Sequence, residues 1–361
     1  MSLGDEIALW KMASAVLWLS VLVLVTLDPC DALAGMRSYR ASSVRMSSSA
    51  LTAPPASFLD CVKLSVAGSK VALSGGAKLL EVEFPPLPLE FLEDSSSSAR
   101  DIADANTRWA IEYARTMSSE VGQVTIIYPD EPELNDAMKY VEAGSNPLNG
   151  RNPYPNVTLA TIRTDSMTNA RSLDQMLGSI FGATFGGEVQ AIPGTKLYVA
   201  VISSTQELTD LEKLYALDPS VPLVFFNLRL DVLRGDLGLP LFPNRDLHYR
   251  FLSKIKPVFL MRSRAFATSL RKPPFIINYS GLLFRKYPEP FQSILNTGNG
   301  KNKVVKTSAN RPTNSDFRDA LTDGLVVPNV SKEELRAPGN LVWWEKDEGA
   351  KGGVLHRDWS S

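Results

Sequence analysis

The sequence predicts an α/β protein with three layers, in which a mainly parallel, Rossmann-like sheet lies between helices and carries an antiparallel edge towards the C-terminus. Short apolar runs typical of buried strands alternate with stretches of helical period between residues 124 and 228. This alternation implies right-handed crossovers, which place helices on both faces of a parallel sheet. After Arg229 the strand-like segments follow one another with few helical residues between them, and this change predicts the antiparallel edge.

Residues 51–80 are rich in small side chains and predict a linker that leads into a single domain over residues 81–335. The prolines of residues 81–94 predict an extended, polyproline-like segment along the surface of that domain. A helix is then expected to begin at the capping-box pair Ser98 and Asp101. Its inward-facing apolar residues recur every three or four positions and are Ile102, Ala105, Trp109, Tyr113 and Met117.

The parallel sheet is expected to contain four strands that are apolar on both faces. These strands are residues 124–128, 157–162, 196–203 and 222–228. The connecting helices are expected over residues 132–143, over residues 172–181 and after the capping-box pair Ser204 and Glu207.

The antiparallel edge is expected from strand-like segments that begin at Pro257, Phe275 and Gly281, which form an edge or a hairpin of the same sheet. From Leu295 onwards the chain is rich in Asn, Lys and Gly. We therefore expect irregular structure there, with one short helix over residues 315–321.

The first fifty residues are typical of a two-part leader. Residues 1–34 hold an apolar run too short to cross a bilayer comfortably and end at Ala32 and Ala34 in an A-x-A pattern, as in a signal peptide. Residues 35–50 are rich in Arg and Ser and lack acidic residues, as in a plastid transit peptide.

Such a leader is similar to that of algae with a secondary plastid, and it predicts a protein of the stroma or of the stromal face of the thylakoid. An ordinary secreted protein and a single membrane anchor are the alternatives. Cys61 alone follows the leader and cannot form an internal disulfide, which fits a reducing compartment.

The sequence carries no recognisable catalytic, cofactor or metal site. Its glycine-rich segment, residues 182–187, lacks the Lys-Ser/Thr pair of a phosphate-binding loop. His248 and His356 are the only histidines, and no cluster of His, Cys and carboxylates has the spacing of metal ligands. We therefore expect no catalytic residues, no cofactor and no metal.

A parallel sheet nevertheless gathers the carboxyl ends of its strands at one edge, where ligands of α/β proteins bind. Here that edge would bring together Asp130, Asn227 and Arg229, with Pro129 and Ser203 beside them. These residues are the candidates for an alternative function, a Rossmann-like enzyme that binds a nucleotide or a phosphorylated metabolite. Only the fold favours this alternative, and a fold does not specify a function.

The charges are unevenly distributed along a chain whose formal net charge is -1. Residues 81–136 contain 13 Asp and Glu against 3 Lys and Arg, whereas residues 245–311 contain 14 Lys and Arg against 2 Asp and Glu. The basic segment favours contact with anionic thylakoid lipids or acidic protein loops, unless the two segments face each other. No segment after the leader is long enough to span a membrane, so a second alternative is a peripheral thylakoid protein. No nucleic-acid partner is expected, because no RNA-binding signature is present.

Five segments of the domain combine prolines, aromatic residues and charges in a fixed order. They are FPPLPLE, DANTRWAIEYAR, VTIIYPDEPEL, PLVFFNLRLD and LLFRKYPEPFQSIL. Together they resemble a family of plants, algae and cyanobacteria that shares a domain of unknown function and is typified by the chloroplast protein Low PSII Accumulation Three. A similar domain is appended to a chloroplast adenylate kinase, but the phosphate-binding loop of that kinase is absent from this sequence. The resemblance, over residues 81–335, implies a non-catalytic plastid factor that assists photosystem II assembly by binding a newly made core subunit or other assembly factors.

The turn YPEPF in the last segment corresponds to a proline-aromatic turn of the family. Its prolines stiffen the backbone and its rings supply apolar area, so it is a candidate docking site or a structural turn that closes the sheet edge. The tail of residues 336–361 holds tryptophans that anchor in a partner's pocket or fold back onto the domain. The candidate partner-binding residues are Tyr287, Pro288, Pro290, Phe291, Trp343 and Trp344.

Overall fold

The computed structural model describes residues 51–93, 98–144, 154–163, 188–270, 273, 275–298, 301–332 and 335. Several predictions fall outside these residues. They are the two parts of the leader, the helix over residues 172–181, the glycine-rich segment 182–187, and the tail with Trp343 and Trp344. Among the described residues, no helix is both long enough and apolar enough to cross a membrane.

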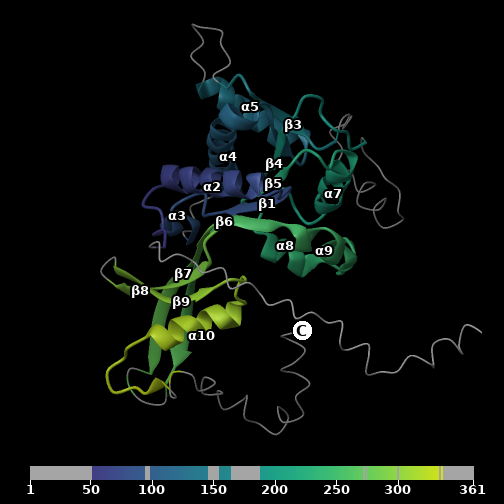
Figure 1. The fold of residues 1–361 in the computed structure, drawn as a ribbon. Coiled ribbons are helices and arrows are strands. Elements are labelled where there is room, and N and C mark those ends of the chain that lie inside the picture. Colours follow the sequence, from purple (N-terminus) through teal and green to yellow (C-terminus); the bar gives the residue numbers. More distant parts are fainter. Residues whose placement is uncertain are drawn as a thin grey trace, which may run out of the picture. The chain divides into compact units, whose positions relative to one another are not determined.

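One mixed sheet forms the centre of the described part, with the strand order β3-β2-β4-β5-β1-β6-β7-β8-β9 (Figure 1). Pairing is parallel from β3 to β6 and antiparallel from β6 to β9, so the predicted α/β fold with an antiparallel C-terminal edge is confirmed. The strands are β1 (Leu79–Glu83), β2 (Val124–Tyr128), β3 (Val157–Thr161), β4 (Leu197–Ala200), β5 (Leu223–Phe226), β6 (Lys256–Ser269), β7 (Ile276–Lys286), β8 (Phe291–Gly298) and β9 (Lys301–Ser308).

Helices cover both faces of the parallel part. Successive side chains of a strand point to opposite faces, so Val224 and Phe226 pack on one helix layer whereas Leu223 and Phe225 pack on the other. The first layer contains α2 (Phe58–Ser74), α4 (Ala99–Val121) and α5 (Glu131–Gly144). The second layer contains α7 (Leu208–Leu217), α8 (Leu230–Asp236) and α9 (Asp246–Arg250), followed by the 3-10 helix η1 (Leu252–Lys254).

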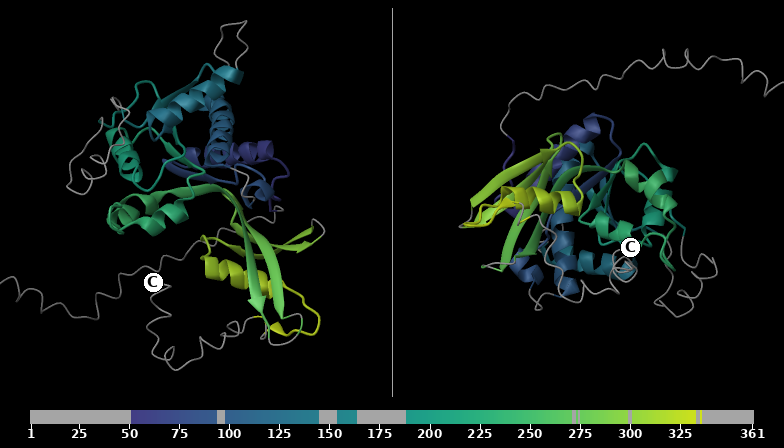
Figure 2. Two further views of the ribbon diagram at one scale, coloured as in Figure 1. Left: turned by 180° about the vertical axis from the view of Figure 1, so that it is seen from behind. Right: turned by 90° about the horizontal axis from the view of Figure 1, so that it is seen from below.

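The antiparallel strands have their own helix on one face. The helix α10 (Asn314–Gly324) packs Phe317 and Leu321 against apolar residues of β6, β7 and β8. In the left view of Figure 2 this helix lies against those strands. On the opposite face, only the part of these strands nearest to β1 packs against α2, through Phe259 and Phe284.

The predicted elements of the parallel part are confirmed where the structure describes them. Each of β2 to β5 lies within a predicted strand, and α5 extends the predicted helix by one residue at each end. The capping box of α4 is present, because the Ser98 hydroxyl accepts from the Asp101 N–H and the Asp101 carboxylate accepts from the Ser98 N–H. The second predicted capping box is only half present: the Glu207 carboxylate accepts from the Ser204 N–H, but α7 begins at Leu208 with Glu207 as its N-cap and without a side-chain cap bond.

The expected linker over residues 51–80 is wrong, because these residues form α2 and the first two residues of β1. Small side chains are needed in α2 for close packing rather than for a flexible connection. A Cβ atom on Gly68 would lie 2.7 Å from the carbonyl oxygen of Val258 in β6. The expected extended surface segment is also wrong at its start, since Glu81 to Glu83 are buried in β1, and it is interrupted by α3 (Leu89–Glu93).

The C-terminal part contains more strand than the sequence predicts. The segments that begin at Phe275 and Gly281 belong to the single strand β7, and the region after Leu295 completes β8 and forms β9. β9 is an edge strand whose exposed residues include three lysines. Lysines on an edge strand prevent it from pairing with another chain. They also interrupt the alternation of apolar and polar residues by which a strand is recognised in a sequence. The predicted short helix is confirmed as α10.

Replacing Gly68 by Ala is expected to destabilise the fold by about 1–3 kcal/mol, because the added methyl group would clash with the backbone of β6. Gly235 in α8 has open space around its Cα atom, so Gly235→Ala is the matched control and should stabilise by up to about 1 kcal/mol. Urea unfolding of both variants measures the difference. Equal effects of the two substitutions would contradict the packing described for α2.

Candidate functional site

A groove of about 230 Å³ lies between the loop that follows β1 and the open face of the antiparallel strands. One wall is apolar and comes from the start of α2 and from residues 85–89. The other wall comes from β6 to β9 and is mostly polar. The lining residues are Phe58, Pro85, Leu87, Pro88, Leu89, Met261, Ser263, Ser280, Gly281, Leu282, Asn296 and Asn302.

Trp109 of α4 holds the apolar wall in place. Its indole N–H donates to the carbonyl oxygen of Pro86 at 2.8 Å, and its ring stacks on Phe58 with the centroids 5.1 Å apart. The helical period of α4 buries this side chain, and the prolines stiffen the loop that it holds. The wall is therefore fixed by a residue that does not itself line the groove.

The second wall follows from strand register. In antiparallel pairs, side chains directly opposite each other lie on the same face, and Ser263 pairs with Leu282 while Asn296 pairs with Asn302. The next residue, Leu283, points to the other face and packs with α10. The face that α10 leaves uncovered thus carries the small and amide side chains of the groove.

Met261 closes the groove next to the buried Cys61, whose Sγ atom lies 3.9 Å from the Met261 sulfur. Burial raises the pKa of Cys61 to about 12, so its thiol stays protonated at neutral pH and serves packing. No charged side chain of the residues that the structure describes lines the groove. Among the described residues, the side chains of Ser263 and Asn302 have no hydrogen-bond partner and remain open to a ligand.

The size of the groove limits what it can hold. Pockets for small molecules and cofactors usually enclose about 300–1,000 Å³ and include a few charged or strongly polar groups. This groove is smaller and uncharged. It suits one or two apolar side chains of a partner, with the partner's backbone able to bond to the polar wall.

A second feature, a set of buried ion pairs, joins β1 to the C-terminal part. Glu83 accepts hydrogen bonds of 2.6–2.8 Å from Nε and Nη2 of Arg262 in β6. Glu81 accepts hydrogen bonds from Nη1 of Arg311, in the loop before α10, at 3.0 and 3.1 Å. Both glutamates are almost completely buried, at 2% and 6% exposure. Asp231 of α8 pairs with both arginines.

The pKa values of Glu81 and Asp231 are shifted in opposite directions. Burial raises the pKa of Glu81, and the nearby charge of Arg311 does not fully offset it. Burial also works against ionisation of Asp231, but there the charges of Arg311 and Arg262 prevail and lower the pKa. The acidic segment 81–136 and the basic segment 245–311 therefore meet inside the protein at these pairs.

The residues predicted for the strand-end crevice have structural contacts. Asp130 accepts a hydrogen bond from the N–H of Glu133 at the start of α5. Asn227 accepts from the N–H of Phe84 at 2.9 Å and donates to Asn106 at 3.0 Å, which ties β5 to β1 and α4. Arg229 is exposed at the start of α8. Asp130 follows β2 whereas Asn227 and Arg229 follow β5, and β4 lies between these strands.

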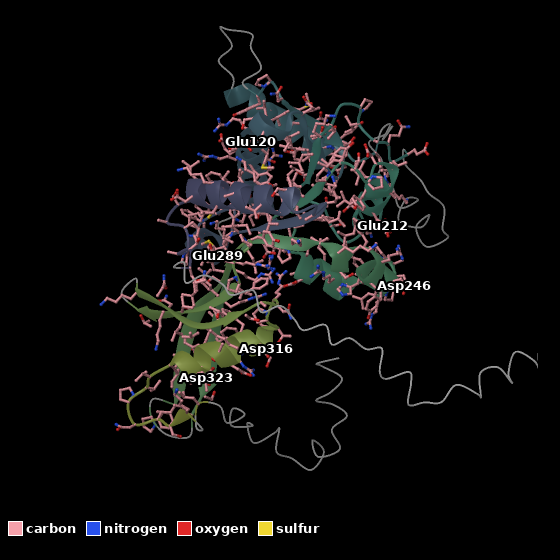
Figure 3. All side chains as sticks on the ribbon, in the orientation of Figure 1. Glu120, Glu212, Asp246, Glu289, Asp316 and Asp323 are labelled. Carbon is pink, nitrogen blue, oxygen red and sulfur yellow. The ribbon has the colours of Figure 1, made fainter. Side chains whose placement is uncertain are left out.

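The YPEPF turn connects β7 to β8 and binds the chain's own N-terminal segment. Glu289, labelled in Figure 3, accepts from the N–H and the hydroxyl of Thr52 at 2.8 and 2.5 Å. Gln292 donates to the Thr52 carbonyl oxygen at 3.0 Å. Phe291 is buried, and Tyr287 packs against the first helix layer. The turn thus joins two inner strands of the sheet and holds the chain's own N-terminal segment, while Trp343 and Trp344 lie outside the described residues.

Sequence reasoning missed the groove because its walls come from segments far apart in the chain. The prolines and leucines of FPPLPLE were the available signal, together with Trp109 in the second family-like segment. Ser263, Ser280 and Asn302 gave no signal, since their position follows only from the pairing of β6 to β9. Among the described residues, no group of His, Cys, Asp and Glu is arranged to hold a metal ion.

Glu81→Gln is expected to gain stability relative to the wild type as the pH rises above 4.5, the ordinary pKa of a glutamate. The raised pKa means that ionisation of Glu81 opposes folding. The stability that protonated Glu81 contributes is therefore present below pH 4.5 and is lost as the pH rises through the folded-state pKa. Denaturant unfolding at a series of pH values measures this, with the exposed Glu131→Gln as control. A difference that stayed flat or fell with pH would contradict the assignment.

The comparison with protein families covers the strands, both walls of the groove and the ion pairs. Residues 55–319 match the family model described as Domain of unknown function (DUF1995). No curated protein and no solved structure matches the chain. The chain therefore belongs to the family that shares this domain of unknown function.

Proposed function

We propose that this protein is a plastid factor that assists photosystem II assembly by binding a newly made core subunit or another assembly factor, and that it acts without catalysis. The observation that carries the proposal is the uncharged groove between residues 85–89 and the antiparallel strands. The leader and the resemblance to the family of Low PSII Accumulation Three support the plastid, on the stromal side of the thylakoid, as the place of action.

The chemistry of the groove supports a protein partner. Binding energy at protein interfaces is concentrated in a few large side chains that fill well-packed pockets. The apolar wall, held by Trp109, offers such a pocket without any movement of the backbone, and Ser263 and Asn302 offer polar atoms beside it. Membrane-protein subunits in assembly expose apolar segments, which are the ligands that this combination fits.

The groove also favours a protein partner over a nucleotide or a phosphorylated metabolite. Phosphate groups are bound by positive charges, backbone N–H groups or helix N-termini. Within the described part of the chain, no Lys or Arg side chain lines the groove, and the volume of the groove is below that of usual cofactor pockets. At the strand ends, Asn227 and Asp130 are engaged in the contacts that hold the fold together.

The segments that carry the family resemblance supply much of the site. FPPLPLE contributes the apolar wall, the segment DANTRWAIEYAR contributes Trp109, and LLFRKYPEPFQSIL contributes Leu282. The same surface is therefore proposed as the binding surface of this protein.

Leu89→Ser is expected to reduce recovery of photosystem II core subunits and assembly factors about tenfold in a mild-detergent pull-down of the tagged protein from its plastid membranes. Leu89 lines the groove and is 42% exposed, so its replacement leaves the core intact. Leu217→Ser, at an exposed leucine at the end of α7, is the matched control. Bound proteins are quantified by mass spectrometry.

Equal recovery of these partners by the wild type and by both variants would contradict a role for the groove. If no photosynthetic protein were recovered with the wild type, the assembly role itself would be wrong. A thermal-shift screen with nucleotides and sugar phosphates would then test the alternative function at Asn227 and Arg229.

A further inference from the structure

The connection between α8 and α9 contains a short, closed turn over residues 238–243, with the sequence GLPLFP. The N–H of Gly238 donates to the carbonyl oxygen of Pro243 at 2.8 Å, and the N–H of Phe242 donates to that of Leu239 at 3.1 Å. These two bonds and two prolines restrict the backbone of the turn. The turn therefore has a defined backbone conformation.

The turn directs large apolar side chains into solvent. Leu239, Leu241 and Phe242 are 48%, 51% and 39% exposed. Leu241 has a φ of +71°, a left-handed conformation that is uncommon for leucine. Beside the turn, Tyr249 of α9 is 72% exposed. A single exposed leucine needs no explanation, but several in one closed turn form an apolar tip.

Positive charge is in excess in residues 244–254, which follow this apolar tip in the chain and hold Arg245, Arg250 and Lys254 against Asp246. In the described part of the chain, Arg245 and Lys254 form no ion pair, whereas Arg250 is paired with Glu212. Arg245 stands at the base of the turn, where its Nε donates to the carbonyl oxygen of Leu237 at 3.3 Å. Two carboxylates that flank the turn, Asp236 and Asp246, form no ion pair among the described residues, and Asp236 accepts a hydrogen bond from the Thr205 hydroxyl at 3.0 Å; Figure 3 labels Asp246 and Glu212.

We propose that the turn of residues 238–243 enters the interfacial layer of a lipid bilayer, with Tyr249 and Arg245 at the level of the headgroups. A membrane interface accepts apolar side chains deepest, aromatic rings at the headgroup level and cations at its charged surface. The turn presents these groups in the same order, with apolar side chains at the tip, an aromatic ring beside them and a cation at the base. A bilayer needs no complementary pocket, which fits an exposed turn that takes no part in the lining of the groove. This contact goes beyond the proposed groove function and does not depend on it.

The proposal is tested in the full chain with a fluorophore placed at the tip. In a Cys30→Ser background, Phe242→Cys is labelled with the environment-sensitive dye nitrobenzoxadiazole, because Cys61 is buried with a raised pKa and does not react. The matched control carries the dye through Leu217→Cys, on α7. Vesicles of phosphatidylcholine and phosphatidylglycerol with a lipid-borne quencher report contact at the labelled site, whatever other part of the chain binds the vesicle.

The dye at position 242 should shift to the blue and be quenched, while the dye at position 217 should not. Adding Leu239→Ser and Leu241→Ser should weaken quenching at position 242 about fivefold or more, and quenching should largely survive high salt because apolar burial is not screened. Absence of quenching at position 242, or equal quenching at both positions, would overturn the proposal. Loss of vesicle contact in Leu89→Ser would also count against it, because the groove takes no part in this contact.

Discussion

Two buried carboxylates in β1 form the constraint on which the arrangement of the described part depends. Glu81 and Glu83 lie inside the sheet, where an unpaired charge would be strongly unfavourable. Arg262 of β6 and Arg311 before α10 must therefore reach them, and both arginines also contact Asp231 of α8. The parallel part, the antiparallel part and the second helix layer are joined at this point. Backbone pairing between β1 and β6 alone would not fix the loop that carries Arg311.

The position of the groove depends on these ion pairs, which connect β1 to β6 and to the loop before α10. The chain leaves β1 immediately after Glu83 and forms the apolar wall, while the opposite wall begins on β6 at Met261, next to Arg262, and continues over β7 to β9. The two walls therefore face each other because the ion pairs hold their strands in place. α10 covers one face of the antiparallel strands and leaves the other to the groove. A binding surface of this kind is set by the rigid sheet and needs no mobile loop.

Much of the fold could be predicted from the sequence where local pattern and tertiary role agree. Four of the five residues of Val124–Tyr128 are apolar or aromatic because the strand is buried on both faces, and the Ser98 capping box marks the start of α4. The pattern was misleading where packing requires unusual residues. Gly68 and its small neighbours suggest a linker but permit close contact with β6, and the glutamates of β1 suggest a surface segment but are paired by residues far away in the chain.

The site was harder to predict than the fold for a similar reason. Asn227 was correctly placed at the end of a parallel strand, but its amide is used to bind Phe84 and Asn106. The YPEPF turn is predicted as a docking site or a structural turn, and in the structure its Glu289 accepts hydrogen bonds from Thr52 of the same chain. Ser263 of β6 and Asn302 of β9 line the same groove only through strand pairing and register, which a single sequence does not specify.

The most direct test of this account is the free energy of unfolding of Arg262→Met, of Glu83→Leu and of the double variant, measured in urea. Removing one partner of a buried pair leaves the other charge unpaired, so each single variant should lose about 3–5 kcal/mol, and the double variant should lose clearly less than the sum of the two. Arg250→Met, at the exposed pair with Glu212, should change stability by about 1 kcal/mol or less. If Arg262→Met behaved like Arg250→Met, the buried ion pairs would not be the constraint that joins the two parts of the sheet.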